Sequence, residues 1–400
     1  MPIIHSIEQG FATLVTWLEQ TLFIDIYGLP LVIIWLVAGA VFFTLRMGLI
    51  NIRAFGHAVQ VILGKYDTPD EPGEVSHAQA LFTALSATVG LGNIAGVAIA
   101  IHLGGPGAVV WMTLAGFLGM STKFVECTLG QKYRIVDEQG HTAGGPMYYL
   151  SQGLEDLGRP FTGQVLAATF SGCCLLGALG GGNMFQANQS YYALSSLIPA
   201  LADYRPWYGL LLAVFVGLVI LGGIRRIGAV AGVIVPAMAG LYLAAGLWIL
   251  GSHPGEIWPA FQTILHDAIH PQAVEGGAIG VMVQGIRRGV FSNEAGIGTA
   301  SIAHSATRTS EPVREGVVAM LEPFIDTVLI CNMTALVCIV TGVYTTPDLT
   351  GVNLTLAAFS TELAWFPVIL TLAVCLFAFS TIISWYYYGV QAWEYLLGQS

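Results

Sequence analysis

The sequence predicts an all-α polytopic membrane protein. Of its 400 residues, 55% are hydrophobic and only 10% are charged, whereas soluble domains have about 45–50% and about 25%. Mean hydropathy is +0.72, and several apolar runs reach about 20 residues, the length that spans the hydrocarbon core of a bilayer. The runs are continuous rather than alternating, which excludes a β-barrel.

The chain divides into an external segment, residues 1–26, and a single transmembrane domain, residues 27–400. The first 26 residues contain no Lys or Arg, so they lack the basic region of a signal peptide. We expect an amphipathic helix over residues 1–25 on the outer membrane surface. Its lipid-facing residues would be Trp17, Leu18, Leu22 and Phe23.

Nine apolar segments are expected to cross the bilayer. They lie near residues 28–46, 77–103, 106–129, 163–197, 207–223, 227–250, 276–304, 315–343 and 363–396. Of the 14 basic residues, Arg287 and Arg288 fall within a crossing, Arg205 falls on one side, and the others fall on the opposite side. The positive-inside rule therefore places the N-terminus outside and the C-terminus in the cytoplasm, in a plasma (inner) membrane.

The second crossing is interrupted by Gly90, Gly92 and Asn93. Irregular backbone at bilayer depth is tolerated only where it is buried in protein or lines a cavity. Close packing of small residues explains most of the 49 glycines, but it does not require the neighbouring Thr88 and Asn93. The sequence therefore predicts a broken helix.

The pattern Asn-x-Ala-Gly-x-x-x-Ala occurs at residues 93–100 and again at residues 293–300, in the seventh crossing. That crossing is also interrupted by glycines. The second copy begins five crossings after the first, and an odd number inverts the orientation in the membrane. Paired broken helices in inverted repeats indicate the binding site of a transporter. We expect a first repeat over residues 77–250 and a second, incomplete one over residues 276–400.

Five motifs resemble the alanine/glycine:cation (sodium) symporter family, whose members have the leucine-transporter-like fold. They are residues 88–96, 144–149, 289–296, 322–326 and 380–385. The resemblance implies one extra helix followed by two inverted sets of five. The second to sixth crossings would be the first set, and the seventh to ninth would be three members of the second. The chain would then lack the last two helices of the family.

The resemblance also implies function: a sodium-coupled secondary symporter for a small neutral amino acid, alanine or glycine, working by alternating access around two unwound helices. Na⁺ would be the coupling ion, with no cofactor, no enzymatic activity and no nucleic-acid partner. The alternatives are a proton-coupled amino-acid carrier or a truncated, non-transporting sensor or fragment. A channel is less favoured because no selectivity-filter motif is visible. The oligomeric state is not specified by the sequence.

An amino-acid carboxylate suits free backbone N–H groups, such as those of Leu91 and Gly92 at the break. Asn183 and Gln186, three residues apart in the fourth crossing, would bind substrate or join helices by hydrogen bonds. By resemblance, Phe291 and Trp385 wall the pocket. The full expected substrate site is Thr88, Gly90, Leu91, Gly92, Asn93, Asn183, Gln186, Phe291, Ser292, Asn293, Thr381 and Trp385.

Carbonyl oxygens near Ser86 and Val89 would suit Na⁺, and by resemblance the hydroxyls of Thr381 and Ser384 complete that site. Asp326 lies deep in an apolar run, where an unpaired carboxylate costs about 3 kcal/mol on insertion scales. Three interpretations of Asp326 stay open: a sodium or proton ligand, a partner of Arg287 or Arg288, and a protonated acid in a hydrogen-bond network.

Arg287, Arg288 and Glu294 flank the second break and are candidates for a gate, or alternatively for a static buried pair. Lys123 and Glu126, three residues apart near the cytoplasmic end of the third crossing, are expected to form a solvated local pair. The histidines are scattered over span ends and loops, so a zinc enzyme is not expected.

Overall fold

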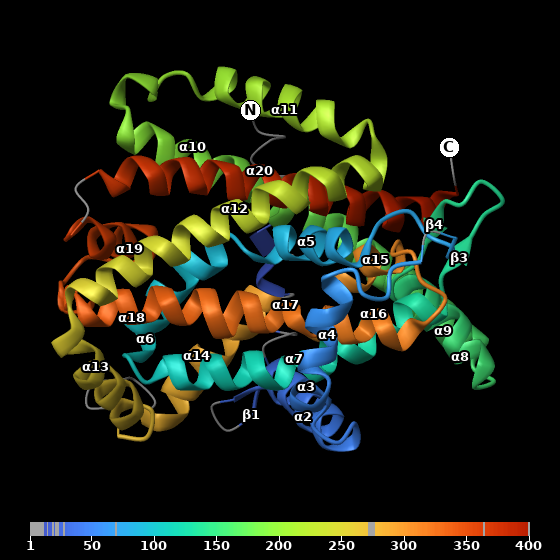
Figure 1. Cartoon of the computed structure of the whole chain (residues 1–400), viewed down its shortest axis with the longest axis horizontal. Helices are drawn as coiled ribbons and strands as arrows, with labels where there is room; N and C mark the ends of the chain where they lie inside the picture. Colours follow the sequence, from blue (N-terminus) through green and yellow to red (C-terminus); the bar gives the residue numbers. More distant parts are fainter. Residues whose placement is uncertain are drawn as a thin grey trace.

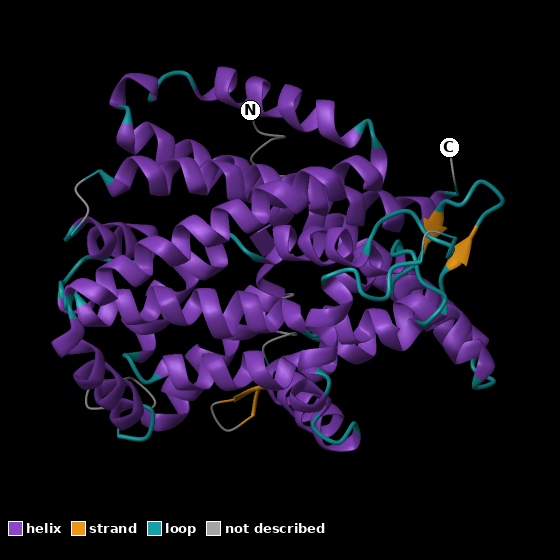
Figure 2. Ribbon diagram, viewed as in Figure 1, coloured by secondary structure: helices purple, strands orange, loops and turns teal. Residues whose placement is uncertain are grey.

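The computed structural model describes residues 12–13, 15–17, 20, 24–26, 29–68, 70–270, 277–362 and 365–398. These residues are mostly helical, with two small antiparallel hairpins (Figure 2). The hairpins are β1–β2 (Asp25–Ile26, Leu29–Pro30) and β3–β4 (Ile135–Val136, Thr142–Ala143). The expected surface helix over residues 1–25 lies largely outside the described residues.

In chain order, the helices up to the second break are α2 (Leu31–Arg46), α3 (Ile50–Arg53), α4 (Phe55–Ile62), α5 (His77–Thr88), η1 (Gly92–Gly96), α6 (Val97–Gly104), α7 (Ala108–Lys132), α8 (Pro146–Asp156), α9 (Pro160–Gly177), η2 (Ala178–Phe185), α10 (Gln186–Leu197), η3 (Pro199–Leu201), α11 (Arg205–Ile220), α12 (Gly223–Ser252), α13 (Pro254–Asp267) and α14 (Gly277–Asn293). The later ones are α15 (Ala300–Ser305), α16 (Pro312–Ala319), α17 (Leu321–Pro323), η4 (Phe324–Cys331), α18 (Asn332–Val340), η5 (Val343–Thr345), α19 (Gly351–Ser360) and α20 (Phe366–Leu397).

Each of the nine expected crossings coincides with a helix or a run of helices. Within the described residues, five runs are long and apolar enough to cross a membrane alone, and a bent pair makes a sixth. Helices α2 and α11 are apolar but have only 16 residues each. The lengths therefore support an all-α membrane protein with five or six clear spans.

The second crossing is broken between α5 and η1. Helix α5 begins with a capping box, in which Ser76 and Gln79 bond each other's backbone N–H groups. It ends at Thr88, Val89 is extended, and the chain resumes as η1 and α6 at a bend of 52°. The Asn93 side-chain oxygen accepts the Gly90 N–H at 2.7 Å. The side chain of Asn93 thus stabilises the irregular turn that the glycines permit.

The seventh crossing is broken between α14 and α15. Glu294, Gly296 and Gly298 have φ values of +53°, +90° and +94°. Glycine adopts this left-handed region freely, whereas at Glu294 it is strained. The Asn293 side-chain oxygen accepts the Ala295 N–H at 3.0 Å. Equivalent asparagines, residues 93 and 293, therefore cap both breaks.

Within the described part of the chain, three segments, η1, η2 and η4, are π-helical. Such segments occur frequently at functional sites. At η2 and η4, side-chain amides donate hydrogen bonds to carbonyl oxygens five residues earlier in the chain. Asn183 bonds Ala178 O at 2.5 Å, Gln186 bonds Gly181 O at 3.2 Å and Asn332 bonds Thr327 O at 3.2 Å. These amides let the wider turn persist in an apolar environment.

Helix α5 packs against α12 and α20, and α14 packs against α7. Figure 1 shows α20, in red, running beside α10 and α12, with the α5 half-helix beneath them. Hairpin β3–β4 and α8 lie at one end of the bundle, and α13 and α19 lie at the other (Figure 1). A buried apolar cluster that includes Leu85, Ile94 and Phe359 surrounds the first break. This packing brings both breaks into the interior.

Candidate functional site

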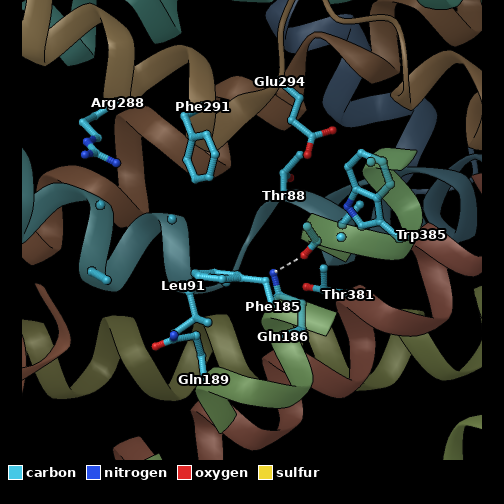
Figure 3. Close-up of a pocket in the computed structure, with 18 of the residues that line it drawn as sticks. Thr88, Leu91, Phe185, Gln186, Gln189, Arg288, Phe291, Glu294, Thr381 and Trp385 are labelled. Atoms are coloured by element: carbon cyan, nitrogen blue, oxygen red, sulfur yellow. Dashed lines mark hydrogen bonds between the residues drawn. The ribbon is translucent and has the colours of Figure 1, made fainter. Parts of the chain in front are cut away.

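A cavity of about 760 Å³ lies beside the first break. Its wall comes from the break itself and α6, from η2 and α10, from α14 and the turn after it, and from α20 (Figure 3). The lining residues are Ala87, Thr88, Gly90, Leu91, Gly92, Ala95, Gly96, Ile99, Gly177, Gly180, Gly181, Phe185, Gln186, Gln189, Arg288, Phe291, Glu294, Ile297, Thr381 and Trp385. The lining is apolar with a few polar groups, as is typical of small-molecule sites.

Most of the expected substrate residues line this cavity. They are Thr88, Gly90, Leu91, Gly92, Gln186, Phe291, Thr381 and Trp385. Phe291 is 62% exposed, and its ring points into the space above Thr88 and Leu91 (Figure 3). Trp385 faces it from α20 (Figure 3). Two aromatic rings therefore restrict the volume near the break.

Asn93, Ser292 and Asn293 do not reach the cavity wall, although all three were expected there. Their side chains are buried behind it. The Asn93 amide nitrogen lies 2.6 Å from Asp326 Oδ1 and 3.2 Å from Ser292 Oγ, and the Asn293 amide bonds Thr327 Oγ1 at 2.9 Å. These polar groups are hydrogen-bonded to one another, because a buried polar group without a partner is costly. The hydrogen bonds link the two breaks.

Asn183 also lies away from the cavity lining. Its amide bonds a carbonyl of its own helix, as described for η2, and so supports the π-helical turn. Gln186 makes a similar bond to Gly181 O but stays in the lining (Figure 3). Its side-chain oxygen is buried and accepts no hydrogen bond within the described residues.

The expected sodium-site residues meet between α5 and α20. Thr381 Oγ1 donates to the Ser86 carbonyl at 2.8 Å, and the Ser86 and Ser384 hydroxyls are hydrogen-bonded. Ser86 and Ser384 have no exposed surface. Val89, in extended conformation, lies three residues after Ser86. The structure thus brings Ser86, Thr381 and Ser384 together in one buried place, and their oxygens are the ligand type that hard cations prefer.

Asp326 is completely buried on η4. Its carboxylate accepts hydrogen bonds from Asn93 at 2.6 Å and from the Thr327 hydroxyl at 2.8 Å. Within the described residues, no ion pair to Asp326 is found, and these neutral donors are its partners. This arrangement fits two of the three interpretations, an ion ligand and a hydrogen-bonded acid, better than pairing with Arg287 or Arg288.

The gate candidates separate in space. Arg288 and Glu294 line the cavity, from opposite sides of Phe291 (Figure 3). Glu294 Oε2 accepts the Thr299 hydroxyl at 2.6 Å. Arg287 is exposed and is not among the lining residues. Of the three, Arg288 and Glu294 are therefore placed to contact a substrate.

Lys123 corrects one expectation. It was expected to form a solvated pair with Glu126, but its side chain has no exposed surface. Its ammonium lies 3.1 Å from Glu322 and 3.5 Å from Glu126. The expected pair with Glu126 forms, but the expectation that it is solvated is wrong, because Glu322, 199 residues away in the chain, joins it through the packing of α7 against α17.

The structure adds lining residues that the sequence did not suggest. Gln189 follows Gln186 by three residues, so both face the cavity from α10, and Phe185 precedes them (Figure 3). The i, i+3 spacing of the two glutamines could have indicated this. Gly177 and Gly182 also matter, because a Cβ on either would contact the Trp385 side chain, at 3.3 Å and 2.4 Å.

The bundle end near β3–β4 is held together by polar contacts. The Arg134 guanidinium donates to the carbonyls of Pro72, Ser305, Thr307 and Thr309 at 2.8, 2.8, 2.5 and 2.6 Å. The buried Glu315 carboxylate bonds both His77 and His304. These contacts hold the start of α5 against α15, α16 and the segment between them.

Comparison with known proteins agrees with this architecture. The family model described as the sodium:alanine symporter family matches residues 11–400. The chain is 43% identical, over 92% of its length and 81% of the relative's, to "Sodium/alanine symporter AgcS" of Methanococcus maripaludis. It is 35% identical to "Amino-acid carrier protein AlsT" of Bacillus subtilis, over 94% and 79%, and 34% identical to "Probable sodium/glutamine symporter GlnT" of the same organism, over 91% and 74%.

Proposed function

Because the chain belongs to the sodium:alanine symporter family, we propose that it carries a small neutral amino acid, alanine or glycine, across the cell membrane together with Na⁺. Members of this family are transporters rather than enzymes, and sodium coupling needs no cofactor. The observation that carries the substrate proposal is the cavity beside the broken second crossing, walled by Phe291 and Trp385.

The amino acid is proposed to bind with its carboxylate at the break. Leu91 and Gly92 line the cavity, and within the described residues their N–H groups make no backbone hydrogen bond outside a helix. The α6 side of the break presents a positive helix end to an anion. The Gln186 side-chain oxygen, buried without a partner among the described residues, suits the ammonium group. Phe291 and Trp385 then limit the size of the side chain.

Sodium is proposed to bind among the oxygens of Ser86, Val89, Thr381 and Ser384. Thr381 lines the cavity and also contacts the Ser86 carbonyl, so ion and substrate would share one electrostatic environment. That proximity gives a physical reason for coupling, since each bound charge favours the other. Asp326, held by the neutral donors Asn93 and Thr327, is proposed as a second ion ligand.

We further propose a leucine-transporter-like arrangement with inverted repeats that begin at residues 77 and 276. It is supported by the two breaks, each capped by an asparagine at the same position of the repeated motif. In the proposed orientation, with the N-terminus outside, Ile99, Gln189 and Arg288 lie on the outer side of the break. The Arg134 and Glu315 contacts then close the cytoplasmic end, and the conformation is outward-facing.

Uptake of labelled alanine into proteoliposomes tests the function. An inward Na⁺ gradient should drive saturable accumulation, and an equal K⁺ gradient should not. Unlabelled alanine inside the vesicles should accelerate entry by counterflow, which a channel does not show. Equal uptake in Na⁺ and K⁺ would overturn sodium coupling, and linear uptake without counterflow would overturn the carrier mechanism.

A further inference from the structure

Two oppositely charged side chains lie along the wall that α14 and the turn after it give to the cavity. Arg288 is on α14, Glu294 follows it by six residues, and both line the cavity. Phe291 lies between them in the chain and in space (Figure 3). We name these three residues the Arg288–Glu294 row. Six residues of an α-helix advance by roughly 9 Å, so the row is long compared with an α-amino acid.

The positive end of the row lacks a counter-charge. Within the described residues, none of the salt bridges includes Arg288, and its buried Nε has no hydrogen-bond partner there. The ionisable neighbour that acts on it, Arg287, has the same sign. A partly desolvated cation without a partner is costly. A carboxylate is the group whose two oxygens match the fork of a guanidinium.

The negative end of the row also lacks an ion pair in the described part of the chain. Glu294 Oε2 accepts the Thr299 hydroxyl at 2.6 Å, which is a neutral donor. Lys123 lies within electrostatic range, but its ammonium contacts Glu322 and Glu126 instead. Figure 3 shows the Glu294 carboxyl group directed toward the cavity. This carboxylate therefore suits an ammonium group that arrives from the cavity.

The middle of the row is apolar. Phe291 is 62% exposed and its ring separates the two charges, so Arg288 and Glu294 cannot pair while it stays there. Ile99 and Phe185 also line the cavity, so a ligand that lies along the row meets apolar surface between its ends. A cavity of about 760 Å³ is of the size that holds drug-sized ligands, which are far larger than alanine.

We propose that the Arg288–Glu294 row binds an ω-amino acid, in which several methylene groups join the carboxylate to the ammonium. The carboxylate accepts hydrogen bonds from the Arg288 guanidinium, the methylene groups pack on Phe291, and the ammonium donates to Glu294. An extended chain advances about 3.3–3.6 Å per three bonds, so the chain of 6-aminohexanoate spans roughly 7 Å from nitrogen to carboxyl carbon. An α-amino acid is too short to contact both ends. This second class of ligand goes beyond the proposed alanine substrate and does not depend on it.

Equilibrium dialysis of the purified protein in detergent, with labelled 6-aminohexanoate, measures this binding directly. The wild type should bind the ligand saturably. Among unlabelled ω-amino acids of increasing length, from β-alanine to 8-aminooctanoate, competition should be strongest at an intermediate length. Hexanoate and hexylamine each lack one charge and should compete at least tenfold more weakly, because a hydrogen bond to a charged group is worth roughly a factor of ten or more.

Two variants test the two ends of the row separately. Arg288→Gln should lower the affinity for 6-aminohexanoate at least tenfold, and in this variant 6-aminohexanamide should bind as well as 6-aminohexanoate. Glu294→Gln should show the converse, with hexanoate as good a ligand as 6-aminohexanoate. A merely structural role would not remove discrimination at one end of the ligand alone. Arg205→Gln, exposed at the start of α11 and outside the cavity lining, is the matched control and should bind as the wild type does.

No saturable binding of 6-aminohexanoate by the wild type would overturn the proposed site. Equal competition by hexanoate, hexylamine and unlabelled 6-aminohexanoate would overturn it as well, and so would an unchanged affinity in the variants. Each variant reports on its own end, so a variant that fails to fold leaves the other decisive. Binding is measured here without transport. Absence of labelled alanine uptake would therefore overturn the proposed function alone.

Discussion

The hydroxyl of Thr381 on α20 donates a hydrogen bond to the main-chain carbonyl of Ser86 on α5, at 2.8 Å. These residues are separated by 295 positions, yet they face each other at the broken crossing. One turn further along α20, Ser384 bonds the Ser86 hydroxyl. The contact between α5 and α20 therefore defines the place where the ion is proposed to bind, directly beside the substrate cavity.

Replacing Ser384 with alanine should weaken sodium binding. The hydroxyl is one of few oxygens in a dry environment, and an interaction with a charged group is worth roughly 1.5–3 kcal/mol. We expect the half-saturating Na⁺ concentration for alanine uptake to rise at least about tenfold, since a factor of ten corresponds to about 1.4 kcal/mol. Ser380→Ala on the same helix is the control, because its hydroxyl bonds Phe377 O within that helix. Equal shifts in both variants would refute the assignment.

Replacing Gly182 with alanine should destabilise the protein. A Cβ at Gly182 would lie 2.4 Å from Trp385 Cβ, so η2 and α20 would have to separate. Overpacking of this kind costs roughly 1–3 kcal/mol and should lower the thermal unfolding midpoint. Gly172→Ala on α9 is the control, because a Cβ at Gly172 would have no described atom within 4 Å. A midpoint unchanged in both variants would show that the η2–α20 contact is loose.

Replacing Phe291 with alanine should broaden substrate size. The ring occupies the cavity above the break, and removing it creates room for several methylene groups, each worth about 0.8 kcal/mol when buried. Leucine should then compete with labelled alanine at least tenfold better than in the wild type. Phe161→Ala, on the exposed start of α9, is the comparison variant. Unaltered competition by leucine would place the size limit elsewhere.

Replacing Lys123 with alanine should be severely destabilising. Glu322 would remain buried without its cation, and breaking a buried ion pair from one side costs roughly 3–5 kcal/mol. We expect a large fall in the yield of monodisperse protein after detergent extraction, with partial recovery in Lys123→Met/Glu322→Gln. Lys132→Ala, exposed at the end of the same helix, should have little effect. A stable Lys123→Ala protein would contradict the burial of this pair.

The sequence by itself determined the class of protein and the position of the first break. Apolar runs of bilayer length leave few alternatives to helices, and Gly90, Gly92 and Asn93 mark a turn whose cause is local. The repeated pattern at residues 93 and 293 indicated the second break for the same reason. Thr88, Phe291, Thr381 and Trp385 could be placed near one another through the family motifs.

Only the tertiary structure decided which polar side chains face the cavity. Asn93 and Asn293 turn inward because Asp326 and Thr327, on a third helix, supply their partners. Lys123 is buried because Glu322 meets it across the α7–α17 contact. Helical spacing predicts which residues share a face of a helix. The orientation of a buried polar side chain depends instead on where its hydrogen-bond partners and its counter-charge lie. Those partners lie far away in the chain, and folding alone brings them together.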